Sequence, residues 1–131
     1  MKELVEKASA YISAGTSQGI GLSDHQIITV LHTLLSNKKP DINFLNQVGY
    51  LIQSNKIQKI NSLTNILYVF AKLKYRNQEC LVAAANTMKR AIDNGDWDEF
   101  PIKVVCRNLW NFYDLNHYDE ELFKNFCEIL S

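Results

Sequence analysis

The sequence predicts an all-α protein: an α-solenoid of about three helical hairpins preceded by one N-terminal helix, giving about seven helices in a single domain of 131 residues. Two observations lead to this prediction. Apolar residues recur at three- and four-residue spacing along most of the chain, which is the period of an amphipathic helix, and no stretch reads as a strand. A segment from the middle of the chain also returns near the C-terminus, and internal repetition of this kind is typical of solenoids.

The repeated unit runs from Leu67 to Leu81 and returns from Leu109 to Phe123, 42 positions later. Four matched pairs define it: Leu67 and Leu109, Phe70 and Phe112, Leu73 and Leu115, Glu79 and Glu121. We expect a weaker copy in the first hairpin, with Ile28, Leu31 and Leu34 in the places of Leu67, Phe70 and Leu73, a shift of 39. Stacked hairpins bury one continuous core, which a single hairpin cannot do.

The N-terminal part of the chain is expected to form a helix over residues 2–14 and a glycine-rich loop over residues 15–21. This loop lacks the Gly-Lys-Ser/Thr ending of a phosphate-binding loop. The first hairpin then spans about residues 23–54. Ser23 is expected to cap its first helix, with Gln26 completing a capping box, and Asp41 to cap its second helix.

The second hairpin is expected at about residues 60–94 and the third at about residues 101–131. Asn77 and Asp119 are the expected caps of their second helices, because short polar side chains accept hydrogen bonds from free helix N–H groups. Gly95 is expected to end the second hairpin, since glycine adopts the left-handed conformation that terminates many helices.

Charge is distributed unevenly behind a formal net charge of zero. Residues 37–92 carry nine Lys and Arg against two acids, a net charge of +7, whereas residues 93–131 carry three against nine, a net charge of −6. Such asymmetry suits a polyanion-binding surface beside an acidic docking surface, and it equally suits two solvated faces.

The repeated unit resembles organellar helical-repeat proteins of the octotricopeptide and heptatricopeptide type, including the helical region of FAST-kinase-like and RAP-domain proteins. Residues 67–73 and 109–115 carry the likeness, followed by residues 77–79 and 119–121, and it extends over roughly residues 23–131. The tetratricopeptide pattern, with its period of about 34 residues, is not matched. The resemblance implies a helical-repeat module in mitochondrial or plastid RNA metabolism, as an RNA-binding or ribosome-associated component.

Basic residues gather near the predicted turns, where aligned hairpins would stack them into a stripe that contacts phosphates. Tyr68 could add a stacking face for an unpaired base. Tyr75, Trp110, Tyr113 and His117 fit either stacking or packing. The candidate RNA-binding residues are Lys38, Lys39, Lys56, Lys59, Tyr68, Lys72, Lys74, Arg76 and Arg107.

Polar residues on the first helices of the hairpins, Asn65, Asn108 and Asn111, either read base edges or are solvated. A second function remains open: a protein–protein interaction scaffold or structural subunit without direct RNA contact, because stacked helices offer a groove for a partner helix. The acidic, aromatic loop with Trp97 and Phe100 is the candidate protein-interaction site.

Catalysis, a cofactor and a metal site are not expected. The three His residues lie far apart in sequence without Cys or carboxylates at ligand spacing, and Cys106 is expected to be buried and inert. Three widely spaced cysteines argue against a disulfide framework. No apolar run approaches the length of a membrane span, and the N-terminus resembles neither a secretory signal nor a transit peptide. We expect an organelle matrix from the resemblance, and otherwise the cytoplasm.

Overall fold

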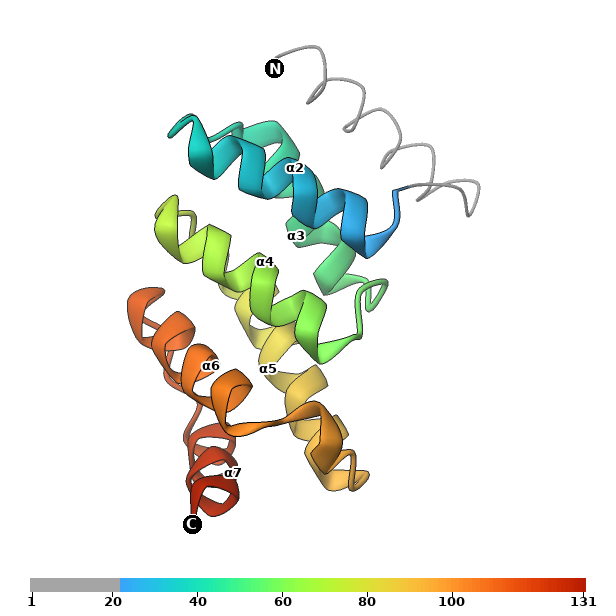
Figure 1. Ribbon diagram of the computed structural model, residues 1–131, viewed down its shortest axis with the longest axis vertical. Helices are drawn as coiled ribbons and strands as arrows, with labels where there is room; N and C mark the ends of the chain where they lie inside the picture. The colour runs from blue at the N-terminus through green and yellow to red at the C-terminus, as the bar shows by residue number, and fades with distance from the viewer. Residues whose placement is uncertain (1–21) are drawn as a thin grey trace.

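The computed structural model describes residues 22–131, which form six α-helices and one short 3-10 helix, without a strand in this range (Figure 1). The all-helical prediction is therefore confirmed. The helix expected over residues 2–14 and the loop over residues 15–21 lie outside the described residues. The elements are α2 (Asp24–Ser36), α3 (Ile42–Gln53), α4 (Ile60–Lys72), α5 (Gln78–Asp93), η1 (Trp97–Glu99), α6 (Ile102–Asp114) and α7 (Glu120–Leu130).

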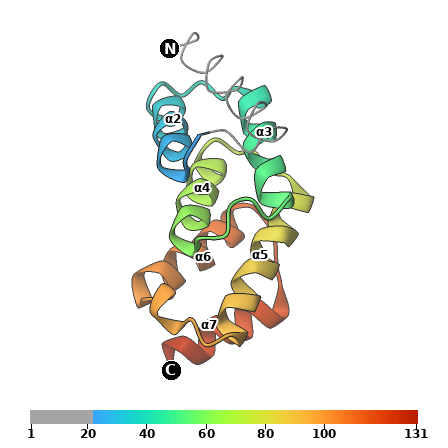
Figure 2. The same ribbon diagram turned by 90° about the vertical axis from the view of Figure 1, so that its right-hand side faces the viewer.

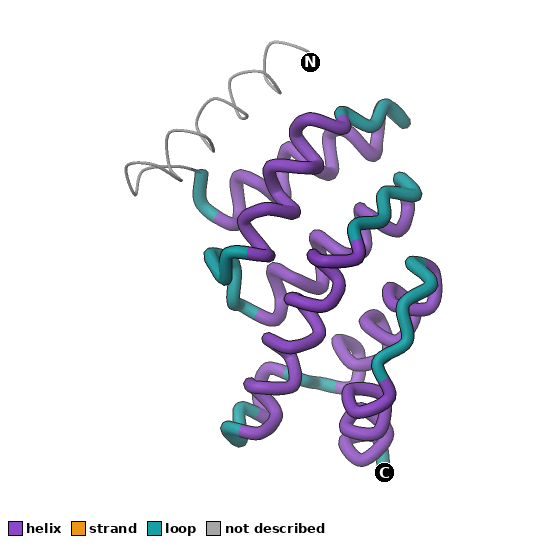
Figure 3. The backbone as a smooth tube through the Cα atoms, turned by 180° about the vertical axis from the view of Figure 1, so that it is seen from behind, coloured by secondary structure: helices purple, strands orange, loops and turns teal. Residues whose placement is uncertain are grey.

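The helices lie in two layers. In one layer α4 packs between α2 and α6, and in the other α5 packs between α3 and α7. Figure 2 shows α2 above α4 in one column and α3 above α5 in the other. The α2–α3, α4–α5 and α6–α7 turns consequently follow one edge of the molecule, and the longer connections follow the opposite edge (Figure 3). We call the first of these the turn edge, formed by residues 37–41, 73–77 and 115–119.

Each turn on this edge reverses at a residue with positive φ: Lys38 at 52°, Lys74 at 58° and Asn116 at 54°. The next residue in each turn donates its N–H to a carbonyl five positions earlier, as in a Schellman motif. These hydrogen bonds are Lys39 N to Leu34 O, Tyr75 N to Phe70 O and His117 N to Phe112 O, at 3.2, 2.8 and 2.9 Å. The three turns are therefore equivalent positions of the repeat.

This equivalence fixes the register of the hairpins. Lys38 and Lys74 are 36 positions apart, so the expected shift of 39 for the first hairpin is wrong by three residues. Leu31 corresponds to Leu67, and Leu34 corresponds to Phe70. The error arose because apolar residues three apart share one helix face, so both registers align an apolar stripe. The shift of 42 between the second and third hairpins agrees with the step from Lys74 to Asn116.

The predicted helix caps are confirmed. Ser23 and Gln26 form a reciprocal capping box, with Gln26 N to Ser23 Oγ at 3.2 Å and Ser23 N to Gln26 Oε1 at 2.9 Å. At the second helix of every hairpin, the capping side chain accepts from the backbone N–H three positions on: Asp41 from Phe44 at 3.0 Å, Asn77 from Cys80 at 3.1 Å and Asp119 from Leu122 at 3.0 Å. Gly95, at φ 82°, follows α5 as expected.

A buried polar network joins α4 to α6. The Nδ2 atom of Asn108 donates to Thr64 Oγ1 at 2.9 Å, and that of Asn111 donates to the Thr64 carbonyl at 3.1 Å. Both asparagines are buried. Neither expectation for them holds, because these amides are neither solvated nor free to read a base. Their role is to align the second and third hairpins.

Candidate functional site

The structure divides the predicted RNA-binding residues between opposite edges. Five of them lie on or beside the turn edge, whereas Lys56 and Lys59 lie in the α3–α4 connection. Lys59 and Lys72 stand at opposite ends of α4, whose 13 residues span about 20 Å at about 1.5 Å per residue. The nine candidates therefore do not form one stripe. The members at the turn edge are Lys38, Lys39, Lys72, Lys74 and Arg76.

Four exposed lysines at the turn edge, Lys38, Lys39, Lys72 and Lys74, carry unneutralised charge. The ion pairs within residues 22–131 involve Lys89 and Lys124, and none involves these four. Lys38 and Lys74 occupy the same repeat position in two neighbouring hairpins, so the lysines belong to neighbouring turns on one edge of the molecule. This arrangement gives a locally positive surface that suits a polyanion.

The ring of Tyr68 contacts two of the predicted RNA-binding cations, Lys72 and Arg107. Its half-buried ring lies 5.4 Å from Lys72 Nζ and 5.2 Å from Arg107 Cζ, measured from the ring centroid. Arg107 comes from α6, so this cluster bridges neighbouring hairpins. Cation–π contacts of this length contribute about 0.5–1 kcal/mol at exposed sites. Tyr68 therefore positions charge near the turn edge, and its ring is already in contact with two cations.

Arg76 differs from the neighbouring lysines because its guanidinium is engaged. Its Nε donates to the carbonyl of Leu115 at 2.7 Å, and its Nη2 donates to the carbonyl of Asn116 at 3.3 Å and to Gln78 Oε1 at 2.6 Å. Leu115 and Asn116 lie at the C-terminal end of α6, where a cation is favoured by the helix dipole. Arg76 thus fastens the second hairpin to the third.

The predicted protein-interaction loop is only partly exposed. Trp97 has 51% of its surface accessible, but Phe100 has 2% and lies 6.2 Å from Phe126 between ring centroids. The expectation that Phe100 faces a partner is therefore wrong. The short helix η1 turns the chain so that Phe100 enters the core while Trp97 remains outside.

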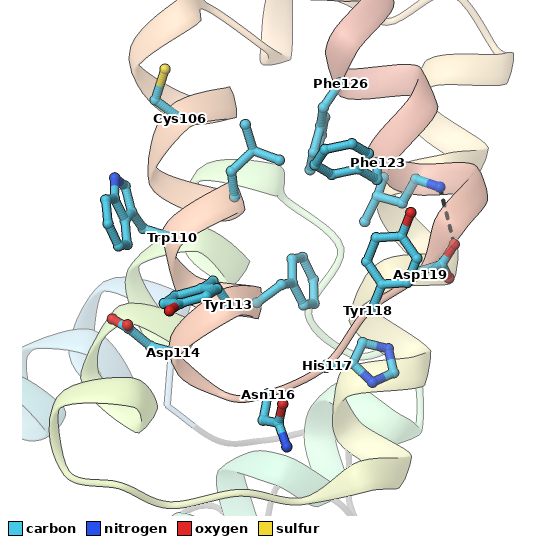
Figure 4. Close-up of a pocket in the computed structure, with 13 residues that line it drawn as sticks. Cys106, Trp110, Tyr113, Asp114, Asn116, His117, Tyr118, Asp119, Phe123 and Phe126 are labelled. Carbon is cyan, nitrogen blue, oxygen red and sulfur yellow. Dashed lines mark hydrogen bonds between the residues drawn. The ribbon is translucent and has the colours of Figure 1, made fainter.

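A larger candidate site lies between α6 and α7, which we call the aromatic groove. It is open, has a volume of about 800 Å³, and is shown in Figure 4. Four exposed aromatic side chains border it: Trp110 at 65%, Tyr113 at 74%, Tyr118 at 71% and Phe123 at 43% accessibility. Trp110 packs edge-on to Tyr113 at 5.7 Å, and Tyr118 lies 5.7 Å from Phe123. Clustered exposed aromatics of this kind mark interaction surfaces.

The charges that line the aromatic groove are acidic. Asp114 and Asp119 contribute carboxylates, and the lining contains neither Lys nor Arg. Burial alone would raise the pKa of Asp119, but hydrogen bonds from Leu122 N–H and Lys89 outweigh it, so its pKa is lowered. Lys89 reaches Asp119 at 2.9 Å.

His117 also lines this groove as a neutral group. Burial lowers its pKa, Asp119 opposes this shift, and Arg76 and Lys89 reinforce it. The net pKa lies below the ordinary value of about 6.5, so the ring is mainly uncharged at pH 7. The groove therefore has negative and neutral polar groups around an aromatic surface.

The three cysteines occupy different environments. Cys80 is buried, and burial raises the pKa of its thiol to about 12, which leaves it unreactive. Cys106 and Cys127 are exposed, and Cys106 lines the aromatic groove. The expectation that Cys106 is buried is wrong, since α6 presents it on the face that no further helix of the described chain covers.

The aromatic groove was not predicted from the sequence, although a signal was present. Trp110 and Tyr113 fit core packing as well as base stacking, and their exposure depends on whether another hairpin follows. Comparing repeat positions gives the signal: Tyr68 and Ala71 of the second hairpin become the larger Trp110 and Tyr113 in the third. Larger apolar side chains at repeat positions that the described hairpins leave exposed indicate a candidate binding face.

Comparison of the chain with protein-family models, with curated proteins and with solved structures finds no match. Among residues 22–131, no helix is long and apolar enough to cross a membrane. The same residues contain no group of three or more His, Cys, Asp or Glu side chains placed to hold a metal ion.

Proposed function

We propose that this protein is a non-catalytic helical-repeat module that contacts RNA along its turn edge. The observation that carries the proposal is the set of four exposed lysines on that edge without an ion-pair partner among the described residues. Each phosphate that a lysine neutralises releases condensed counterions, which favours binding at low salt. The resemblance of the repeat supports an organellar setting, such as a mitochondrial ribosome or RNA-processing assembly.

The salt dependence of RNA binding tests this proposal. With four phosphate contacts, the slope of log affinity against log salt for a single strand is about −3, so affinity falls about 50-fold from about 50 to 200 mM salt. Fluorescence anisotropy with a labelled 12-nucleotide single-stranded RNA measures it. Replacing the four lysines with Gln should abolish binding, while Lys56→Gln with Lys59→Gln on the opposite edge should leave it unchanged. Absence of binding at 50 mM salt, or equal effects of the two variants, refutes the proposal.

A second candidate function is a protein-interaction scaffold that acts without direct RNA contact. The aromatic groove favours it, because its exposed aromatics and acidic rim are unsuited to a phosphate backbone. The two candidates use different parts of the molecule. Variants of the turn edge and of the groove therefore distinguish them in a single set of binding measurements.

A further inference from the structure

The aromatic groove occupies the repeat positions through which one hairpin packs on the next. With the shift of 42, Leu109 and Phe123 correspond to Leu67 and Leu81, which are 0% and 1% exposed. Leu67 and Leu81 belong to α4 and α5, on which α6 and α7 of the third hairpin pack. In the third hairpin the same face has no cover from the described chain, so Phe123 is 43% exposed.

The polar contacts between hairpins show the same correspondence. Thr64 receives the Asn108 and Asn111 side chains, and its counterpart in the third hairpin is the exposed Cys106. Arg76 reaches the carbonyls at the end of α6, and its counterpart is Tyr118 at 71% exposure. The groove thus has the position and shape of a hairpin-packing face, with aromatic side chains in place of the smaller residues of the second hairpin.

We propose that the aromatic groove binds a basic amphipathic helix of a partner protein, which packs on α6 and α7 as the third hairpin packs on α4 and α5. This inference rests on the scaffold candidate and is independent of RNA binding at the turn edge. A helix is the expected occupant, because helices cover the equivalent faces of the first two hairpins. Its apolar stripe contacts the four exposed aromatics, in the manner of a helix laid in a hydrophobic groove.

The charge of the aromatic groove indicates that its occupant is basic. The lining contains no basic residue, and of its two carboxylates Asp119 is paired with Lys89 while Asp114 has no ion-pair partner among the described residues. A helix flanked by Lys or Arg therefore complements the rim, whereas an acidic helix is repelled. A symmetric dimer through this face is disfavoured for the same reason, because a two-fold axis would place Asp114 and its acidic surroundings against their own copies.

The exposed cysteines provide a direct measurement of occupancy. Cys106 lies in the aromatic groove, Cys127 is exposed but does not line it, and Cys80 is buried. Alkylation of Cys106 with iodoacetamide, followed by mass spectrometry, reports on the groove, and Cys127 serves as the control within the same molecule. The probe is a synthetic 18-residue Leu/Lys peptide with amphipathic helical spacing, and the matched control is the same pattern with Glu in place of Lys.

We expect the Leu/Lys peptide at saturation to slow Cys106 alkylation about tenfold and to leave Cys127 unchanged, while the Leu/Glu peptide has no effect. Trp110→Ala with Phe123→Ala should abolish this protection, and Trp97→Ala, at an exposed tryptophan outside the groove, should retain it. Circular dichroism checks that each variant remains folded. Asp114→Asn should weaken the Leu/Lys peptide and leave the alkylation rate of the free protein unaltered.

Four results overturn the proposal. Equal protection by both peptides refutes the charge argument, and no protection by the Leu/Lys peptide refutes helix binding. Concentration-dependent protection without peptide, together with a dimer in sedimentation velocity, identifies a second copy of the chain as the occupant. Protection by the 12-nucleotide RNA identifies nucleic acid instead. Failure of RNA to bind at the turn edge has no bearing on this test.

Discussion

Substitution of Arg76 tests whether its charge at the turn edge stabilises the fold or is free to bind a ligand. In Arg76→Ala the carbonyls of Leu115 and Asn116 lose a cationic donor whose closest hydrogen bond is 2.7 Å. A hydrogen bond to a charged group contributes about 1.5–3 kcal/mol, and solvent access at this exposed side chain places the loss near the lower end, about 2 kcal/mol. Removal of the charge from the end of α6 acts in the same direction.

Thermal unfolding followed by circular dichroism measures this loss. At about 2.1 cal/mol/K per residue, the unfolding entropy of residues 22–131 converts about 2 kcal/mol into a Tm decrease of about 9 °C. Lys74→Gln is the matched control, because it removes a neighbouring charge that forms no hydrogen bond or ion pair with the described residues, and surface changes of this kind stay within about 0.5 kcal/mol. Equal Tm values for the two variants would refute the assignment of Arg76 as a bridge between hairpins.

Three further predictions concern the core, the groove and the turns. Thr64→Val should lower the free energy of unfolding, measured in urea, by about 1–2 kcal/mol. Adding Asn108→Leu should recover most of this loss, because both hydrogen-bond partners are then apolar. Additive effects of the two substitutions would contradict the network. Burial lowers the pKa of His117 in the folded state. The contribution of His117 to the free energy of unfolding should therefore be fully present above about pH 6.5, the unfolded-state pKa, and should be lost as the pH falls toward the folded-state pKa. Urea titrations at pH 5 and 7 measure this loss, and His117→Gln should remove it. Lys74→Gly should raise the free energy of unfolding by about 0.5–1 kcal/mol, since glycine adopts positive φ without strain, while anisotropy shows weaker RNA binding; a less stable variant would contradict this.

Local chemistry made the helix boundaries predictable. The caps Asp41, Asn77 and Asp119 each satisfy a backbone N–H three residues away, so the sequence alone contains both partners of the hydrogen bond. The register of the first hairpin was less accessible, because an apolar stripe is compatible with two alignments. The positive φ of Lys38 and Lys74 selects the shift of 36, and the caps Asp41 and Asn77 are separated by the same number of residues.

The features that could not be predicted depend on contacts between residues that lie far apart in the sequence. Asn108 resembles a solvated helix residue until Thr64, 44 positions earlier, is placed beside it. Phe100 resembles an exposed loop residue until η1 turns it toward Phe126. The aromatic groove depends on the same kind of information, because the exposure of Trp110 is decided by what covers α6 and not by the residues around it in sequence.

The lysines of the turn edge are informative because the fold does not need them. The turn position requires positive φ, which Asn and Gly adopt at lower cost than Lys, and the third turn has Asn116 there. Lys38 and Lys74 hold this position with side chains that form no hydrogen bond or ion pair with the described residues, so their presence is not explained by polar contacts or capping. A residue that lowers stability slightly and forms no polar side-chain contact within the described chain is best explained by an external one. If Lys74→Gly gains stability without losing RNA affinity, that reasoning fails, and the aromatic groove is left as the principal interaction surface.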